Sequence, residues 1–140
     1  MNTLALKLEN RVEAIPAALA AVETFAENQG LPATFVMQTV VSLDEILTNV
    51  IGYGFEDDAI HHIEVDVACA RGEITIEIID DGKAFDPLSQ PAPDLEADLE
   101  NRQARGLGIH LVRTLMDRVR YVRRDGRNHL SIAKATPAGA

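Results

Sequence analysis

The sequence is poor in several features that define whole classes of protein. Its 140 residues include a single cysteine, Cys69, so no disulfide can form within the chain and no zinc site can be built from cysteines. No apolar run approaches the ~20 residues that span a bilayer. The first residues also lack the cationic start and long apolar stretch of a signal peptide. We therefore expect a soluble, cytoplasmic protein that does not contact a membrane.

Basic residues are scarce over the first hundred positions. Residues 1–100 hold 4 Lys and Arg against 20 Asp and Glu, a charge of −16, whereas residues 101–140 hold 9 against 2, a charge of +7. The net charge of −9 argues against a general nucleic-acid-binding protein. The basic C-terminal part either decorates solvent-facing positions or faces an anion, such as a phosphate ligand or an acidic partner.

The hydrophobic pattern predicts an α+β domain. Alternating apolar residues predict strands at 3–8, 63–67, 74–79, 119–123 and 129–133. Apolar residues at helical spacing predict helices at 12–29, 33–54 and 106–117, and Asn10 is expected to cap the first. This order favours a two-layer sandwich, with three helices on one face of a mixed, mostly antiparallel sheet. We expect one domain over residues 1–135 and a flexible tail at 136–140.

Glu45 and Asn49 form the first candidate site. They lie four residues apart on the second predicted helix, so their side chains project side by side. An amide oxygen is a suitable ligand for Mg²⁺ held mostly by water and phosphate, and a neighbouring carboxylate can orient or deprotonate an attacking hydroxyl. The alternative is a polar edge beside the core.

The second candidate is the segment Asp80-Asp81-Gly82-Lys83-Ala84, which follows an apolar strand. It is either a plain turn or a base-binding segment. In the second case Asp80 accepts a hydrogen bond from a base amino group, while Gly82 and Ala84 let the ring approach the backbone.

The third candidate is Arg105-Gly106-Leu107-Gly108, at the start of the last predicted helix. Exposed backbone N–H groups at a helix N-terminus bind phosphate, and Arg105 would add positive charge. Neither a P-loop nor a GxGxxG motif occurs in the sequence, so this is not a known phosphate loop of those types.

Together the three segments resemble the asparagine box and the two glycine boxes of the GHKL superfamily of ATP-binding domains. The stretches SLDEILTNVIGYGF, DDGKAFDP, RGLGIHLVRTLMD and DGRNHLSIAK are most similar to the anti-sigma-factor serine/threonine kinases of that superfamily. The resemblance covers residues 3–134 and implies the Bergerat-type ATP-binding fold. One departure is Ala84, where the wider superfamily has glycine.

The resemblance also implies a role for each candidate residue. Seven residues would bind the nucleotide: Asn49, Asp80, Gly82, Ala84, Arg105, Gly106 and Gly108. Asn49 would coordinate Mg²⁺ between the ATP phosphates, and Asp80 would bond the adenine amino group. Glu45 would act as general base toward a serine hydroxyl. Residues 87–105 would form a lid over the phosphates.

The function implied by the resemblance is that of an anti-sigma regulatory factor with ATP-dependent serine/threonine protein kinase activity. ATP and Mg²⁺ would be its cofactors. Its partners would be a sigma factor and an anti-anti-sigma protein of the STAS type, which it would phosphorylate, and a homodimer is compatible with the family. The alternative is a nucleotide-gated protein-binding module of the same fold without kinase activity. Glu45 favours the enzyme.

Two further residue types are expected to be structural. His61 and His62 are adjacent on a predicted strand and would point to opposite faces, so we expect them to face solvent and not to bind a metal. Cys69 is expected to be a buried strand residue.

Overall fold

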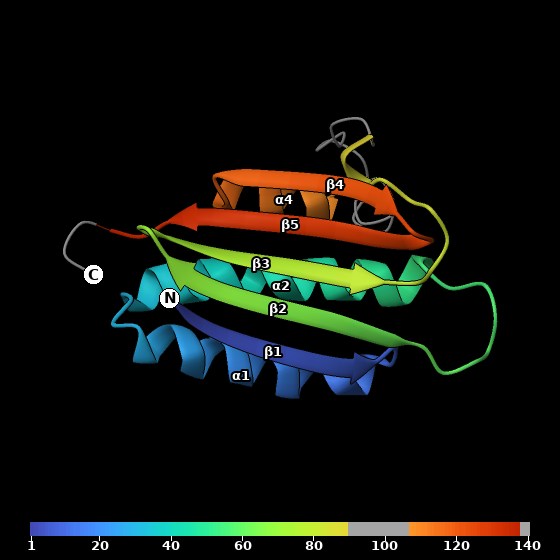
Figure 1. The fold of residues 1–140 in the computed structure, drawn as a ribbon, viewed down its shortest axis with the longest axis horizontal. Coiled ribbons are helices and arrows are strands. Elements are labelled where there is room, and N and C mark those ends of the chain that lie inside the picture. The colour runs from blue at the N-terminus through green and yellow to red at the C-terminus, as the bar shows by residue number, and fades with distance from the viewer. Residues whose placement is uncertain (90–106, 138–140) are drawn as a thin grey trace.

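The computed structural model describes residues 1–89 and 107–137, and its elements follow the predicted order (Figure 1). The strands are β1 (Asn2–Glu9), β2 (His62–Ala70), β3 (Glu73–Asp80), β4 (Arg118–Arg124) and β5 (Arg127–Ala135). The helices are α1 (Ile15–Asn28), α2 (Ala33–Tyr53) and α4 (Leu107–Leu115). Short 3-10 helices occur at η1 (Val12–Ala14) and η2 (Pro87–Ser89).

The five strands form one sheet in the order β1-β2-β3-β5-β4, and every neighbouring pair is antiparallel. The mixed sheet that we predicted is therefore antiparallel throughout its described pairs. Helices α1 and α2 connect β1 to β2, and β2 pairs antiparallel with β1. Strands β3 and β4 do run parallel, because both are antiparallel to β5, but β5 lies between them.

The helices cover one face of the sheet, and the other face is open (Figure 1). Strand residues that point to the helices are buried, as in the central strand β3, where Ile74, Ile76 and Ile78 are at most 1% exposed. They pack against the apolar side of α2, which contributes Leu43, Ile46 and Leu47. Each fully buried side chain of this kind stabilises the fold by about 1.5–3 kcal/mol. This core fixes α2 under the sheet and thereby places its polar residues.

Two tight hairpins set the register of the sheet. Arg71 and Gly72 have φ of 55° and 76°, and Asp125 and Gly126 have φ of 54° and 74°, the left-handed pairs of two-residue type I′ turns. The second turn pairs Asn128 of β5 with Arg123 of β4, and on its other side Asn128 lies directly opposite Asp80 of β3.

Some local expectations differ from the structure. Asn10 does not cap α1, because η1 intervenes and Ala14 takes the cap position. The Asn10 side chain instead accepts a hydrogen bond from the His61 backbone N–H at 2.9 Å. Cys69 lies in β2 but is only half-buried. In the described ranges, no helix is long and apolar enough to cross a membrane.

The C-terminal end stays attached to the sheet slightly further than we predicted. The Thr136 backbone N–H donates a hydrogen bond to the Gly72 carbonyl at 2.9 Å. Residues 138–140 of the predicted tail lie outside the described residues.

Candidate functional site

A cleft open to solvent lies where the C-terminal end of β3 meets α2 and α4. The space between its walls, open solvent included, is about 500 Å³. Its apolar lining includes Ile46, Val50, Phe85, Ile109 and Leu130. The polar side chains in it are those of Glu45, Asn49, Asp80, Lys83, Tyr121 and Asn128. An apolar slot with a few polar groups suits a flat ring that carries polar substituents.

Glu45 and Asn49 lie one turn apart on α2, and both line the cleft. Both side chains are half-buried, and neither hydrogen-bonds to any residue in 1–89 or 107–137. Burial raises the pKa of Glu45 above its ordinary value, and the negative charge of Asp44 raises it further. A raised pKa makes the carboxylate a better proton acceptor near neutral pH.

Gly108 of α4 lies directly against Glu45. A Cβ atom at position 108 would sit 2.6 Å from Glu45 Oε2, closer than any real contact, so only glycine leaves this carboxylate its position. The structure therefore brings together two predicted site residues from different helices. Gly108 does not itself line the cleft, whereas its neighbour Ile109 does.

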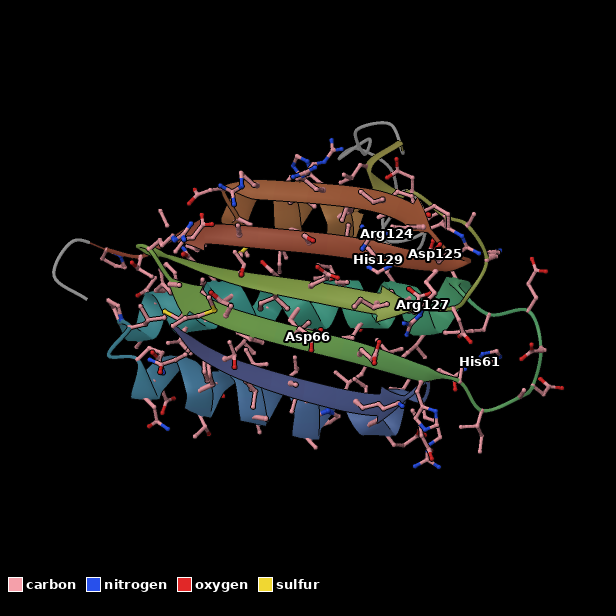
Figure 2. All side chains as sticks on the ribbon, viewed as in Figure 1. His61, Asp66, Arg124, Asp125, Arg127 and His129 are labelled. Carbon is pink, nitrogen blue, oxygen red and sulfur yellow. The ribbon has the colours of Figure 1, made fainter. Side chains whose placement is uncertain are left out.

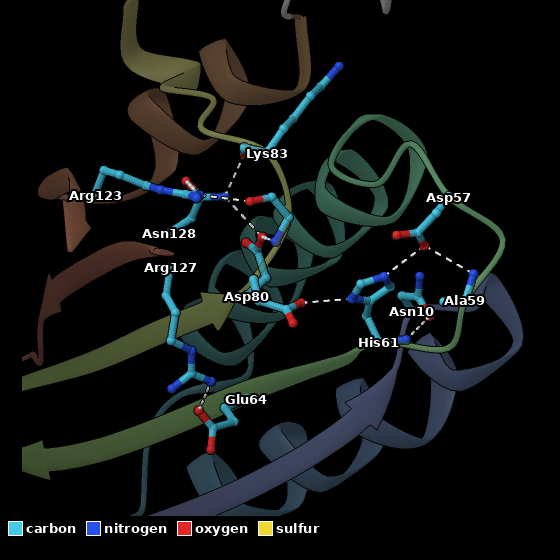
Figure 3. Close-up of polar contacts among 12 residues, drawn as sticks. Asn10, Asp57, Ala59, His61, Glu64, Asp80, Lys83, Arg123, Arg127 and Asn128 are labelled. Atoms are coloured by element: carbon cyan, nitrogen blue, oxygen red, sulfur yellow. Dashed lines mark hydrogen bonds and ion pairs between the residues drawn. The ribbon is translucent and has the colours of Figure 1, made fainter. Parts of the chain in front are cut away.

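Asp80 ends β3 and is only 3% exposed. Its Oδ1 accepts hydrogen bonds from the Gly82 backbone N–H and from Asn128 Nδ2, each at 2.9 Å (Figure 3). Its Oδ2 has no hydrogen-bond partner in the part of the chain that the structure describes. Every buried side-chain oxygen in that part does have a partner, so Oδ2 is not buried, and Asp80 lines the cleft. Oδ2 is therefore open to the cleft, where it can accept a hydrogen bond from a ligand.

Gly82 is required by close packing of the chain. A Cβ atom there would lie 2.3 Å from the Gly54 carbonyl oxygen and 2.9 Å from Asp80 Oδ1. The Lys83 backbone N–H donates to the same Gly54 carbonyl at 2.8 Å, which ties the end of β3 to the end of α2.

The remaining predicted residues are placed differently. Ala84 is exposed and does not line the cleft. Arg105, Gly106 and most of the predicted lid at 87–105 lie outside the described residues.

Our sequence analysis missed Asn128. Its side chain is buried, and its amide nitrogen donates to Asp80 Oδ1 and to the Lys83 carbonyl, both at 2.9 Å. Its Oδ1 accepts from the Tyr121 hydroxyl and, at 3.1 Å, from Arg123 Nη1. The C-terminal hairpin thus forms one wall of the site. The only signal in the sequence was the Asp125-Gly126 turn, which predicts the β4–β5 hairpin but not the pairing of β5 with β3.

The prediction that His61 simply faces solvent is wrong. Its Nε2 lies 2.8 Å from Asp57 Oδ1 and its Nδ1 lies 3.0 Å from Asp81 Oδ1 (Figure 3). Its ring also stacks on Phe55, with centroids 4.6 Å apart. The hydrogen bond to Asp57 is the main cause that raises the pKa of His61, and the one to Asp81 adds to it. His61 lies just before β2, so only His62 belongs to the strand as expected, and His62 is exposed.

Residues 8–134 match the family of histidine kinase-like ATPase domains, and the chain belongs to this family. This result confirms the GHKL superfamily and the α+β fold predicted above, and it implies that the chain uses ATP. A relative called serine/threonine-protein kinase BtrW, from Bordetella bronchiseptica, is 35% identical over 89 residues, which are 64% of this chain and 63% of that protein. The anti-sigma F factor of Clostridium botulinum is 30% identical over 95 residues, which are 61% of this chain and 66% of that protein.

The chain therefore spans slightly less than two thirds of the length of these two relatives. A solved structure of the RsbU and RsbW domains of a Mycobacterium tuberculosis protein has a TM-score of 0.70 and 16% identity. The match covers 97% of this chain and 33% of the chain in the solved structure. At this identity the likeness supports the fold alone.

Proposed function

We propose that this chain is an anti-sigma regulatory factor with ATP-dependent serine/threonine protein kinase activity. The observation that carries the proposal is the pairing of Glu45 and Asn49, two polar side chains without described hydrogen bonds, in an apolar cleft that is also lined by Asp80. The names of the relatives, a serine/threonine-protein kinase and an anti-sigma factor, support the same function.

In this proposal the cleft holds ATP with its base toward Asp80 and its phosphates toward α2. Asp80 Oδ2 accepts a hydrogen bond from the adenine amino group, and the apolar lining packs against the ring. Gly82 and Ala84 belong to the segment that follows Asp80 in the chain, and Arg105, Gly106 and Gly108 are proposed to bind the phosphates. The last three would stabilise the phosphates through backbone N–H groups and positive charge.

Asn49 fits a magnesium site of the kind that kinases use. Its amide is free of hydrogen bonds to the described residues, and a single neutral oxygen ligand suits an ion held mainly by water and phosphates. When bound, Mg²⁺ neutralises phosphate charge. The contribution of this chain is to orient the phosphates from one face of α2.

Glu45 is proposed as the general base. As the serine oxygen of the partner forms a bond to the γ-phosphorus, the bond from that phosphorus to the bridging oxygen of ADP breaks, and the hydroxyl proton passes to Glu45. Its raised pKa supports this role, because a base with a pKa nearer to neutrality keeps the proton more readily. The acceptor would be an anti-anti-sigma protein of the STAS type, and a sigma factor would be the second partner.

The proposal also covers the location and the oligomeric state of the protein. A sigma factor acts in the cytoplasm, so we place the protein there. A homodimer is compatible with the family, and light scattering would test whether one forms.

The test is transfer of labelled γ-phosphate from ATP to a candidate STAS-type partner. Glu45→Gln keeps the shape of the side chain but removes the base, so we expect transfer to fall by about 10²-fold or more while ATP binding is retained. Glu27→Gln on α1 removes the same charge away from the cleft and should leave transfer unchanged. If the wild type binds ATP but transfers no phosphate to any such partner, the chain is instead a nucleotide-gated binding module.

A further inference from the structure

The hydrogen-bonding capacity of the Asn128 amide is fully used. The amide nitrogen has two N–H donors, which go to Asp80 Oδ1 and to the Lys83 carbonyl. The amide oxygen has two acceptor positions, which take the Tyr121 hydroxyl and Arg123 Nη1. Figure 3 shows Asn128 beside Arg123, Lys83 and Asp80. The side chain is 7% exposed, so solvent cannot easily replace these partners.

Arg123 fixes which way round this amide lies. A guanidinium group has only donors, so the atom of Asn128 that faces Arg123 must be the oxygen. Arg123 is itself held by a second hydrogen bond to the Gly82 carbonyl at 2.7 Å. The opposite end of the amide, which faces Asp80, must therefore be the nitrogen.

This orientation determines what Asp80 offers to a ligand. With Oδ1 occupied by the amide of Asn128 and the backbone of Gly82, the carboxylate is held at one oxygen and cannot rotate without breaking two hydrogen bonds. The second oxygen is left in the cleft as an acceptor. A purine with an amino group at position 6 matches this acceptor, whereas a purine with a carbonyl there places two oxygens against each other.

We propose that Asn128, held by Tyr121 and Arg123, is a positioning residue that sets the preference of the site for 6-amino over 6-oxo purines. The inference rests on the proposed function only in taking a purine nucleotide as the ligand, and it does not depend on phosphate transfer. It also gives the C-terminal hairpin a part in base selection, although the hairpin need not touch the base.

The first test compares binding of ATP and of inosine triphosphate by calorimetry. In Asn128→Ala the Asp80 carboxylate loses one of its two anchors, so we expect ATP affinity to fall about tenfold and the ratio of the two affinities to fall several-fold. Tyr121→Phe removes one of the two donors to the amide oxygen and should lower the ratio less. His129→Gln is the matched control, since its ring pairs with Glu77 on the open face of the sheet, and its ratio should equal that of the wild type.

The second test uses Asn128→Asp, which preserves shape but puts a carboxyl group 2.9 Å from Asp80 Oδ1. Two carboxylates at this distance do not both ionise readily, so they share a proton at low pH and repel each other at high pH. Arg123 faces the new carboxyl group and keeps one of the two ionised. We expect ATP affinity of this variant to fall as pH rises, over a range in which the wild type changes much less.

These outcomes separate the inference from the proposed function. If Asn128→Ala loses affinity for both nucleotides equally and Asn128→Asp shows no added pH dependence, Asn128 is merely structural and the inference is wrong. If the folded wild type binds neither nucleotide, the proposed function fails first. A melting curve for each variant identifies any that does not fold, and Tyr121→Phe then still tests the affinity ratio.

Discussion

At the scale of single residues, the site depends on side chains that are close but uncommitted. Glu45 touches the α-carbon region of Gly108 without a hydrogen bond to any described residue, and burial and Asp44 raise its pKa. Asp80 keeps one oxygen bonded and one open. A residue that must react with or bind a ligand keeps hydrogen-bonding atoms without protein partners, whereas in a residue that only stabilises the fold these atoms are paired.

The contact between Gly108 and Glu45 predicts a separation of stability from activity. In Gly108→Ala the new methyl group displaces the flexible end of Glu45, which costs the fold little, and alanine favours the helix by up to about 1 kcal/mol. We therefore expect unchanged or higher stability in denaturant but phosphate transfer reduced on the order of 10²-fold, because the base is misplaced.

Gly52→Ala is the control for this prediction. A Cβ atom at position 52 of α2 meets nothing within 4 Å, so this variant should gain stability without losing transfer. Equal transfer rates in Gly108→Ala and the wild type would show that the position of the Glu45 carboxylate is not critical.

His61 predicts a pH dependence of stability. Its pKa is raised in the folded protein, so its contribution is fully present below the unfolded pKa of about 6.5 and is lost as pH rises through the folded value. A neutral imidazole has one N–H and cannot donate to both Asp57 and Asp81. The stability difference between the wild type and His61→Gln, measured in denaturant, should therefore shrink toward alkaline pH. A difference that stays constant with pH, or one matched by His62→Gln, would speak against this account.

At the scale of elements, the two hairpins have turns of the same type I′ geometry, but only one of them lies beside the site. The turn at Gly72 lies at the end of β2 and β3 away from Asp80, while the turn at Gly126 holds Asn128 opposite Arg123, beside the pair that Asn128 forms with Asp80. Neither glycine has an atom near its missing Cβ, so substitution costs only backbone strain.

This pair provides a matched prediction. Gly72→Ala and Gly126→Ala should each destabilise the fold by about 1–2 kcal/mol, because alanine is strained at φ of 76° and 74°. Only Gly126→Ala should also weaken ATP binding, as measured by calorimetry under conditions where both variants are folded. Equal ATP affinities in the two variants would contradict the role of the hairpin in the site.

The elements themselves could be predicted from the sequence because hydrophobic periodicity is local. The alternation over residues 74–79 and the stripe of α2 gave β3 and its partner helix within one or two residues of their observed ends. The wall formed by Asn128 could not be predicted, since it depends on the pairing of β3 with β5, which are 46 residues apart along the chain. The same holds for Gly108 against Glu45 and for His61 between Asp57 and Asp81.

At the scale of the whole molecule, the charge asymmetry of the sequence is only partly explained by a ligand. Several basic residues of the C-terminal part pair with acidic residues across the sheet, in Arg118–Glu73, Arg127–Glu64 and His129–Glu77. Figure 2 shows Arg124 of β4 and His129 of β5 near each other, whereas Arg127 of β5 extends across β3 toward β2, where it pairs with Glu64. Arg123 reaches the site, where it donates hydrogen bonds to the Gly82 carbonyl and to Asn128. The three ion pairs across the sheet contribute up to about 1 kcal/mol each to stability, so their main effect is to balance charge.

We propose above all that the cleft beside β3 binds ATP through Asp80. The stability of the whole fold should then depend on the concentration of ATP. A ligand that binds only the folded state stabilises it by about 2.7 kcal/mol at a concentration of 100 times its Kd. In Asp80→Asn the amide can still accept the hydrogen bonds from Gly82 and Asn128, but its NH₂ group then faces the adenine amino group, donor against donor.

The most direct measurement is titration calorimetry of ATP with Mg²⁺ into the wild type, Asp80→Asn and the exposed loop variant Asp58→Asn. We expect the wild type and Asp58→Asn to bind with the same affinity and Asp80→Asn to bind at least tenfold more weakly while remaining folded. Wild-type affinity in folded Asp80→Asn would contradict the assignment of the cleft.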